Sequence, residues 1–316
     1  MSELVSIIVP CYNASRWLAE TLESALAQTW PIKEILVIND GSSDDSLAVA
    51  QTFVARGVQV IDQPNRGASA ARNHGLRLAR GNFIQFLDAD DLLSPEKIAR
   101  QVELLRSKPA GTLASCAWGR FTTDWQAAAF TDKEVFRDFS PVDFLVLAGD
   151  AGVMMHPSAW LVPRAVAERA GPWDEKLSLN DDGEYFCRVL LASAGVSYCA
   201  DPAVRSYYRS GLAGSLSQQR GEKARRSQFL SVALVARHLR AAEDSARTRR
   251  AAANYFQRFV HDFYPSPADL MTAADREIAA LGGSSLRVPP MGPRTRALAS
   301  VLGWKNVWRL KYLLSR

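Results

Sequence analysis

The 316-residue sequence predicts an α/β protein, in which a mostly parallel central sheet with flanking helices is followed by a helical C-terminal region. In the first hundred residues, short β-branched runs alternate with segments of helical periodicity, which is the pattern of parallel strands joined by crossover helices. From about residue 216 the chain becomes rich in Ala, Arg, Leu and Gln and poor in strand formers. We therefore expect a first domain over residues 1–215 and a mostly helical region over residues 216–316.

The first half of the predicted sheet comes from two strand-helix pairs. Residues 4–10 (LVSIIVP) form a continuous apolar run, as expected of a strand buried on both faces. Residues 15–28 place their apolar side chains on one helical face. Residues 33–40 (KEILVIND) form the second strand, and a helix opens after them at Ser43 or Asp44, which are both good N-cap residues.

The second half of the predicted sheet repeats this pattern. Residues 58–62 (VQVID) form a short third strand, residues 67–80 have helical periodicity, and residues 82–88 (NFIQFLD) form the fourth strand. Ser94 and Pro95 then begin the next helix, at N-cap and first-turn positions.

Polar side chains follow every one of these strands. They are Tyr12 and Asn13, Asn39 and Asp40, Asn65, and the acids Asp88, Asp90 and Asp91. In open α/β sheets, ligands bind beyond the carboxyl ends of the strands. We therefore expect these side chains to converge on one cleft.

Charge and cysteine content exclude several classes of protein. The net charge of +5 is uneven, because residues 221–316 hold 17 Lys and Arg against 7 Asp and Glu, whereas residues 1–220 hold 21 against 26. The four cysteines have neither a disulfide framework nor zinc-ligand spacing, so we expect reduced thiols in a cytoplasmic protein. No basic signal-peptide start is present, and no run reaches the roughly 18 apolar residues of a membrane-spanning helix. The expected location is cytoplasmic or peripheral at the inner membrane face.

Three acids crowd together where the fourth strand ends. Asp88, Asp90 and Asp91 repel one another unless something positive lies among them. Mg²⁺ or Mn²⁺ would suit, because these ions take one or two carboxylates together with substrate phosphates. The alternative is a solvated turn that caps the helix at Ser94.

Five sequence motifs occur in order over roughly residues 4–195. They are VSIIVPCYN, INDGSSDDS, NRGASAARNHGL, FIQFLDADD and GPWDEKLSLNDDGEYFCRVL. Together they resemble the family 2 glycosyltransferases of the GT-A fold, and the resemblance covers about two thirds of the chain. It implies an enzyme that moves a sugar from a nucleotide-diphosphate sugar, with a UDP-sugar favoured, to a hydroxyl of a glycan, lipid-linked glycan or protein. It also implies a divalent metal, Mn²⁺ or Mg²⁺.

The resemblance assigns nucleotide-binding roles to positions at the strand ends. Pro10 and Tyr12 would lie along the base, and Asp40 would accept a hydrogen bond from a uracil-like ring. Asn65 and Arg72 would touch the base or the ribose. Ordinary explanations stay open for each residue: strand-end packing for Tyr12, a turn for Asp40 and a surface charge for Arg72.

The resemblance also assigns the metal and the catalytic base. Asp88 looks like the ribose-contacting member of a D-x-D motif that also faces the metal, and Asp90 looks like the metal ligand. Asp182 is the expected general base, supported by Asp181, where the family usually has Glu. Attack from behind the anomeric carbon would then invert its configuration. The alternative for Asp181 and Asp182 is helix capping, and a helix N-terminus would lower their pKa values and keep the base ionised.

Residues 206–218 resemble a family loop in which Arg209 and Ser215 reach the donor diphosphate. Physically, a guanidinium and a hydroxyl suit phosphate oxygens, and neighbouring glycines allow a lid to move. An ordinary linker at the domain boundary is the alternative. His156 lies beside apolar residues, and we assign it no chemistry.

The last helical pattern, residues 294–316, is basic and moderately amphipathic. One side carries Lys305, Arg309 and Arg316, and the other carries Trp304, Val307, Leu310 and Leu314. Such a helix can lie on an anionic membrane surface, or pack on a partner subunit of a homo-oligomer or on its own core. No motif for binding nucleic acid accompanies the charge.

Other functions compete with sugar transfer. The sequence has no Q-x-x-R-W motif, which processive relatives usually carry. It lacks the glycine-rich phosphate loop of a nucleotidyltransferase and the G-x-G-x-x-G of a dinucleotide dehydrogenase after residues 4–10. A non-catalytic sensor or scaffold that binds nucleotide sugars on the same fold is the remaining alternative.

Overall fold

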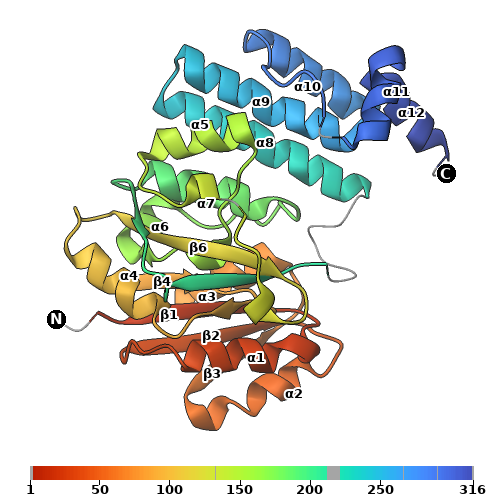
Figure 1. The fold of residues 1–316 in the computed structure, drawn as a ribbon. Helices are drawn as coiled ribbons and strands as arrows, with labels where there is room; N and C mark the ends of the chain where they lie inside the picture. The colour runs from red at the N-terminus through yellow and green to blue at the C-terminus, as the bar shows by residue number, and fades with distance from the viewer. Residues whose placement is uncertain (1–2, 132, 212–220, 266, 290, 315–316) are drawn as a thin grey trace.

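The computed structural model describes residues 3–131, 133–211, 221–265, 267–289 and 291–314. The strands and their helices occupy the lower half of the molecule in Figure 1, and the C-terminal helices lie above them. The predicted α/β class with a helical C-terminal region is confirmed.

The described strands form two sheets. The strands are β1 (Val5–Cys11), β2 (Lys33–Asp40), β3 (Val58–Gln63), β4 (Phe83–Phe86), β5 (Leu92–Leu93), β6 (Leu113–Phe121), β7 (Val162–Pro163), β8 (Val196–Cys199) and β9 (Arg205–Arg209). The central sheet has the order β3-β2-β1-β4-β7, in which only β7 runs antiparallel to its neighbour. The second sheet has the order β5-β9-β6-β8, in which β5 is antiparallel. The four parallel strands of the central sheet, β1 to β4, are the four strands that the sequence predicts.

Helices cover the sheets and form the upper layer. They are α1 (Ser15–Leu26), α2 (Ser46–Gln51), α3 (Ala68–Leu78), α4 (Lys97–Arg106), α5 (Pro141–Ala151), α6 (Arg164–Ala170), α7 (Asp181–Leu191), α8 (Glu222–Ala242), α9 (Ala246–Phe263), α10 (Ala268–Ala280), α11 (Pro293–Leu302) and α12 (Trp304–Leu314).

Two helix starts differ from the prediction. Helix α2 begins at Ser46, where the carboxylate of Asp44, one of the two predicted caps, accepts the backbone N–H of Ser46 (2.9 Å). The same carboxylate accepts the backbone N–H of Ser15 (3.0 Å), which ties the loop before α2 to α1. Helix α4 begins at Lys97, since the hydroxyl of Ser94 accepts the N–H of Arg205 (2.8 Å) and joins β9 instead of capping the helix.

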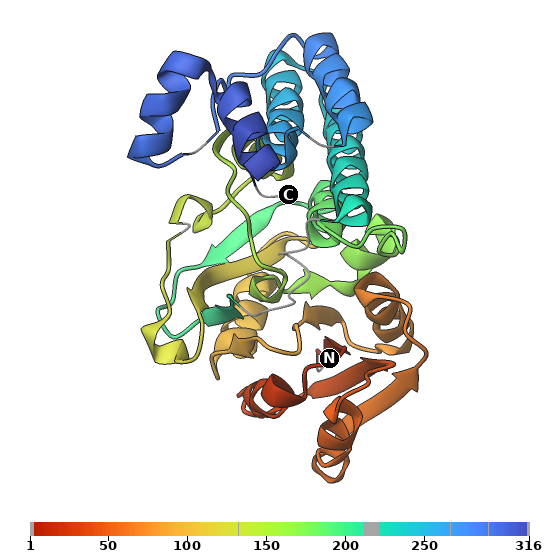
Figure 2. The ribbon, with the colours of Figure 1, turned by 90° about the vertical axis from the view of Figure 1, so that its right-hand side faces the viewer.

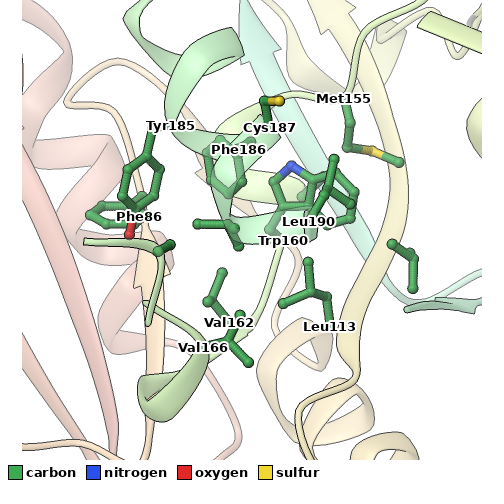
Figure 3. Close-up of a cluster of buried hydrophobic side chains, with 14 of the residues drawn as sticks. Phe86, Leu113, Met155, Trp160, Val162, Val166, Tyr185, Phe186, Cys187 and Leu190 are labelled. Atoms are coloured by element: carbon green, nitrogen blue, oxygen red, sulfur yellow. The ribbon is translucent and has the colours of Figure 1, made fainter. Parts of the chain in front are cut away.

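The main hydrophobic core holds α7 against the end of the central sheet. Figure 3 shows Tyr185, Phe186 and Cys187 of α7 with Phe86 of β4 and Trp160 in this cluster. The ring of Phe86 contacts that of Tyr185 edge-on, with centroids 5.7 Å apart. The rings of Trp160 and Phe186 are stacked, with centroids 5.7 Å apart. This packing fixes the first turn of α7 near the carboxyl ends of the strands.

The C-terminal helices share this core. Val235 of α8 and Ala251 of α9 are buried in the same cluster, and the hydroxyl of Tyr255 donates to the carbonyl of Leu145 in α5 (2.8 Å). In Figure 2, α8 and α9 rise above the sheets, and they pack on α5 and α7. The predicted boundary at residue 215 lies outside the described residues. Among the described helices, none combines the length and apolar character that crossing a bilayer requires.

Candidate active site

One cleft of about 1190 Å³ opens beyond the carboxyl ends of β1, β2 and β4. Ten of the site residues predicted from the sequence line it: Pro10, Tyr12, Asp40, Asn65, Arg72, Asp88, Asp90, Asp181, Asp182 and Arg209. Ser215, the remaining one, lies outside the described residues. The expectation that the polar strand ends converge on one cleft is therefore confirmed for most of them, whereas Asn39 and Asp91 are buried and do not line the cleft.

Asp40 at the end of β2 holds the loop that follows β3. Its carboxylate accepts the backbone N–H groups of Arg66 (2.9 Å) and Gly67 (2.7 Å) and the side-chain amide of Gln63 (2.7 Å). A carboxylate has about four acceptor positions, so capacity for one further donor is left. Gly41 lets this loop approach, because it has φ +66° and a Cβ there would lie 2.7 Å from the backbone nitrogen of Asn65. The predicted hydrogen bond from a base to Asp40 stays a prediction.

The side chains at the mouth of the cleft are more open. The ring of Tyr12 is 54% exposed, so a planar ligand can stack on it without displacing protein contacts. Pro10 is half-buried beside it, and Asn65 is exposed, with its amide donating to the carbonyl of Asp40 (2.9 Å).

Arg72 in α3 joins two of the predicted acids. Its guanidinium donates to Asp88 (2.8 Å) and to Asp181 (2.9 Å), and it lies over the ring of Trp173 at 4.5 Å. Arg72 is only 6% exposed, so both ion pairs lie largely out of water. Burial alone would raise the pKa of Asp88, but the charge and hydrogen bond of Arg72, together with the nearby His156, outweigh it and lower that pKa below its ordinary value. In this structure Arg72 bridges two carboxylates, and its predicted contact with a base or ribose stays a prediction.

The turn after β4 carries more negative charge than Arg72 can neutralise. Burial, with the charge of Asp88, raises the pKa of Asp90 to about 6. Burial and the charges of Asp90 and Asp88 also raise the pKa of Asp91 well above its ordinary value. Oδ2 of Asp91 is buried and accepts no hydrogen bond among the described residues, although Nε2 of His156 lies 3.1 Å from it. These three carboxylates thus have an unmet demand for positive charge.

His156 belongs to this cluster, although the sequence analysis assigned it no chemistry. Its Nε2 lies 3.1 Å from Asp91 and 3.9 Å from Asp88, and burial lowers its pKa to about 4. Its Nδ1 lies 2.7 Å from the hydroxyl of Ser158, and its ring stacks on Tyr208. No spacing motif connects His156 to the D-x-D region, so only the fold reveals this contact.

These residues fit a divalent cation. Donor atoms of Asp88, Asp91 and His156 all lie within 4.8 Å of one another, and the carboxylate of Asp90 faces the same cleft. Carboxylate oxygens are the ligands preferred by Mg²⁺ and Mn²⁺, and a cation would relieve the repulsion that raises the pKa of Asp90. The sequence predicts Asp88 and Asp90 as ligands, and the structure adds Asp91 and His156 as candidates.

Asp181 and Asp182 begin α7 in different environments. One oxygen of Asp181 accepts from the hydroxyl of Ser69 (2.9 Å) as well as from Arg72, which fixes this carboxylate. Asp182 accepts the backbone N–H of Gly183 (2.9 Å). Burial and the charge of Asp181 raise the pKa of Asp182 to about 6. The expectation that the helix N-terminus lowers this pKa is therefore wrong, because burial and a like charge outweigh the helix dipole.

Arg209 is the last residue of β9 and is 2% exposed, so it belongs to the sheet and not to a lid. Its side chain lines the cleft, and its predicted contact with the donor diphosphate stays a prediction. Its backbone N–H donates to Asp91 (2.8 Å), and its Nε donates to the carbonyl of Asp90 (2.9 Å). The guanidinium also pairs with Glu20 and lies over the ring of Trp17 at 4.1 Å. Arg209 therefore holds the acidic turn against β9 from below the cleft.

Known proteins share this architecture. S. aureus TarS, solved as residues 1–349 with UDP-GlcNAc, superposes with a TM-score of 0.69 at 16% identity, over 88% of this chain and 80% of that one. The mannosyltransferase PcManGT of Pyrobaculum calidifontis, solved with GDP-Man and Mn²⁺, gives a TM-score of 0.57 at 17% identity, over 97% of this chain and 84% of that one. These similarities show the GT-A-like fold.

Sequence comparison shows the family. The uncharacterized glycosyltransferase RT0329 of Rickettsia typhi is 28% identical over 196 residues, which cover 61% of this chain and 60% of that protein. The matched segments span 27% to 38% of the next curated relatives. The family model described as glycosyl transferase family 2 matches residues 6–166, just over half of the chain. The chain therefore belongs to glycosyl transferase family 2, as its motifs predict.

Proposed function

We propose that this protein transfers a sugar from a nucleotide-diphosphate sugar to a hydroxyl group, one residue at a time and with inversion at the anomeric carbon. The observation that carries this proposal is that Asp90 and Asp182 line the same cleft. Such a reaction needs two acidic groups. Asp90 is a carboxylate at the candidate cation site, and Asp182 is a separate carboxylate with a raised pKa.

The donor nucleotide would lie over the ends of β1 and β2. Tyr12 offers an exposed ring for the base, Asp40 keeps one acceptor position, and Asn65 stands beside it. We favour a UDP-sugar, since S. aureus TarS, which shares the fold, was solved with UDP-GlcNAc. The diphosphate would then extend toward Asp88 and Asp90.

Mn²⁺ or Mg²⁺ would be held by Asp88 and Asp90, with Asp91 and His156 behind them. Such an ion supplies Lewis-acid stabilisation of the negative charge that develops on a departing diphosphate. Two arginines position these carboxylates. Arg72 pairs with one oxygen of Asp88. Arg209 holds the turn after β4, because its backbone N–H donates to the carboxylate of Asp91 and its Nε donates to the carbonyl of Asp90.

Asp182 would remove the proton of the attacking hydroxyl. A pKa of about 6 leaves this carboxylate ionised near neutral pH, yet makes it a stronger base than an ordinary aspartate. Asp181 and Arg72 act as positioning residues, because their ion pair ties the start of α7 to Asp88. Proton removal on one side of the sugar and departure of the diphosphate on the other give inversion.

The acceptor side of the cleft is apolar, which favours a lipid-linked acceptor over a free glycan or a protein. Beyond Asp182 the cleft continues between α5, α7 and α8, and we call this part the apolar arm. Its walls include Leu145, Ala148, Cys187, Leu190, Val232 and Val235. Such an arm can bind hydrocarbon next to the reacting hydroxyl, whereas it offers few partners to sugar hydroxyls.

We assign these roles to a catalytic domain of residues 1–215, with residues 216–316 as a helical region that completes the apolar arm through α8. Both parts of the chain line the cleft, and its volume of about 1190 Å³ exceeds the roughly 300–1,000 Å³ of a typical small-molecule site, which fits a donor and an acceptor together.

The test is turnover of a panel of UDP- and GDP-sugars with Mn²⁺, measured as release of nucleoside diphosphate with and without a short-chain lipid acceptor. Wild type is expected to release nucleoside diphosphate, and Asp90→Asn and Asp182→Asn to lose this activity. The control is Asp45→Asn, an exposed carboxylate outside the cleft. Ligand-dependent thermal shifts without any turnover would instead identify a non-catalytic sensor or scaffold.

A further inference from the structure

The C-terminal end of the chain combines positive charge with exposed apolar residues. Residues 278–316 contain seven Lys and Arg and no Asp or Glu. Helices α11 and α12 carry five of these basic residues, and all five are exposed: Arg294, Arg296, Lys305, Arg309 and Lys311. The sugar-transfer site described above uses none of them.

Each of these two helices also exposes three large aliphatic side chains. The exposed fractions are 44% for Leu298, 82% for Val301, 45% for Leu302, 47% for Leu310, 69% for Leu313 and 79% for Leu314. Within each helix the three positions follow i, i+3, i+4 spacing, so they lie together on one helical face. Two apolar faces thus lie in water at the surface of the protein.

The opposite side of α12 is attached to the protein. Val307 is 1% exposed, and the ring of Trp304 lies against His261 (5.1 Å) and Tyr264 (5.4 Å) at the end of α9. Gly303, with φ +75°, separates α11 from α12, so the predicted single helix over residues 294–316 is wrong. Trp304 and Val307 of the predicted apolar side pack on the protein itself, which was one of the open alternatives, whereas Leu310 and Leu314 of the same side stay exposed.

The positive charge of α11 and α12 indicates which partner this surface binds. A second copy of the chain would bring the same basic residues into a two-fold interface, where like charges oppose association. An anionic lipid bilayer offers negative phosphates to the basic side chains and hydrocarbon to the aliphatic ones. Helices of ten and eleven residues can lie in the plane of a membrane surface.

We propose that α11 and α12 form a docking surface for an anionic lipid bilayer, with Leu298, Val301, Leu302, Leu310, Leu313 and Leu314 entering the headgroup boundary. This proposal stands on the C-terminal helices alone and does not depend on the chemistry of the cleft.

Co-sedimentation of the full chain with lipid vesicles tests it. One set of vesicles is phosphatidylcholine alone, and in the other a third of the lipid is phosphatidylglycerol. The apolar variant is V301S/L313S/L314S and the charge variant is R294Q/R296Q/K311Q. Matched controls change exposed residues elsewhere, as V54S/L78S/L230S and R77Q/K223Q/R237Q. Circular dichroism checks that each variant is folded.

We expect wild type to bind the anionic vesicles and to be released by salt. The charge variant should bind about 100-fold more weakly, since each basic residue near an anionic surface is worth about 1 kcal/mol. The apolar variant should bind the anionic vesicles at least about tenfold more weakly than wild type, and both controls should bind like wild type. Equal binding to both vesicle types, or no effect of the two variants, overturns the proposal. A dimer seen by light scattering that V301S/L313S/L314S dissociates also overturns it and assigns the surface to a second copy.

Discussion

Replacing Asp182 by Asn tests the proposed base and the local electrostatics in one variant. The amide has nearly the same shape as the carboxylate but cannot accept a proton from the acceptor hydroxyl. We expect Asp182→Asn to lose about 10²-fold to 10⁴-fold in kcat, which is the usual contribution of a positioned base. We also expect the same variant to be more stable than wild type at neutral pH.

The size of the stability effect follows from the raised pKa of Asp182. A shift from 3.8 to about 6 corresponds to about 3 kcal/mol at most, at 1.36 kcal/mol per pKa unit. The side chain of Asp182 is only half-buried and water screens part of the effect, so we expect Asp182→Asn to be about 1–2 kcal/mol more stable than wild type at neutral pH. Because the pKa is higher in the folded state, this stability is fully present below about pH 4 and is lost as the pH rises through about 6. The gain in Asp182→Asn should therefore appear at pH 7.5 and vanish near pH 4.

Urea unfolding of both proteins at pH 7.5 and at pH 4, combined with turnover at pH 7.5, measures both effects. Asp45→Asn is the control, since its carboxylate is exposed and the substitution should change neither quantity. Wild-type turnover by Asp182→Asn would refute the base assignment. An unchanged free energy of unfolding at pH 7.5 would refute the argument from burial and the neighbouring charge.

Three further predictions concern the acidic cleft. The kcat/KM of wild type should rise with pH through an apparent pKa near 6, because Asp182 must be ionised, and a profile flat from pH 5 to 8 would contradict this. Arg72→Lys keeps the charge but loses the two-pronged contact with Asp88 and Asp181, so we expect about 2 kcal/mol less stability in urea unfolding and at least a tenfold lower kcat/KM. Wild-type values for both would show that the bridge is dispensable. Asp90→Asn should abolish the rise in Tm that Mn²⁺ and UDP give together to wild type, and a retained rise would remove Asp90 from the metal site.

Much of the fold is predictable because the signals are local. Strands β1, β2 and β4 are apolar runs with polar ends, and such runs have few other places than the interior of a parallel sheet. The edge strand β3 has a weaker signal, because its pattern of buried residues is broken by exposed ones. The parallel arrangement then brings their carboxyl ends to one edge, so Tyr12, Asp40 and Asp88 share a cleft whatever the loops do. The second sheet gives a weaker signal, since β5 has two residues and β8 has four.

The contacts that depend on distant segments could not be predicted. His156 meets Asp91 across 65 positions of sequence, and its neighbours Met155 and Pro157 give no sign of a polar partner. Arg72 reaches Asp181 across 109 positions, so its bridging role appears only when α3 and α7 are packed together. Local sequence sets which elements form, whereas the partner of a buried charge is set by how those elements pack.

The proposed sugar transfer requires that the donor and the catalytic base occupy separate places in one cleft. Calorimetric titration of wild type, Asp90→Asn and Asp182→Asn with UDP in the presence of Mn²⁺ examines this directly, when paired with turnover of the same three proteins. We predict that Asp90→Asn loses both nucleotide binding and turnover, whereas Asp182→Asn binds UDP like wild type and loses only turnover. Loss of UDP binding in Asp182→Asn, or full binding and turnover in Asp90→Asn, would contradict the account.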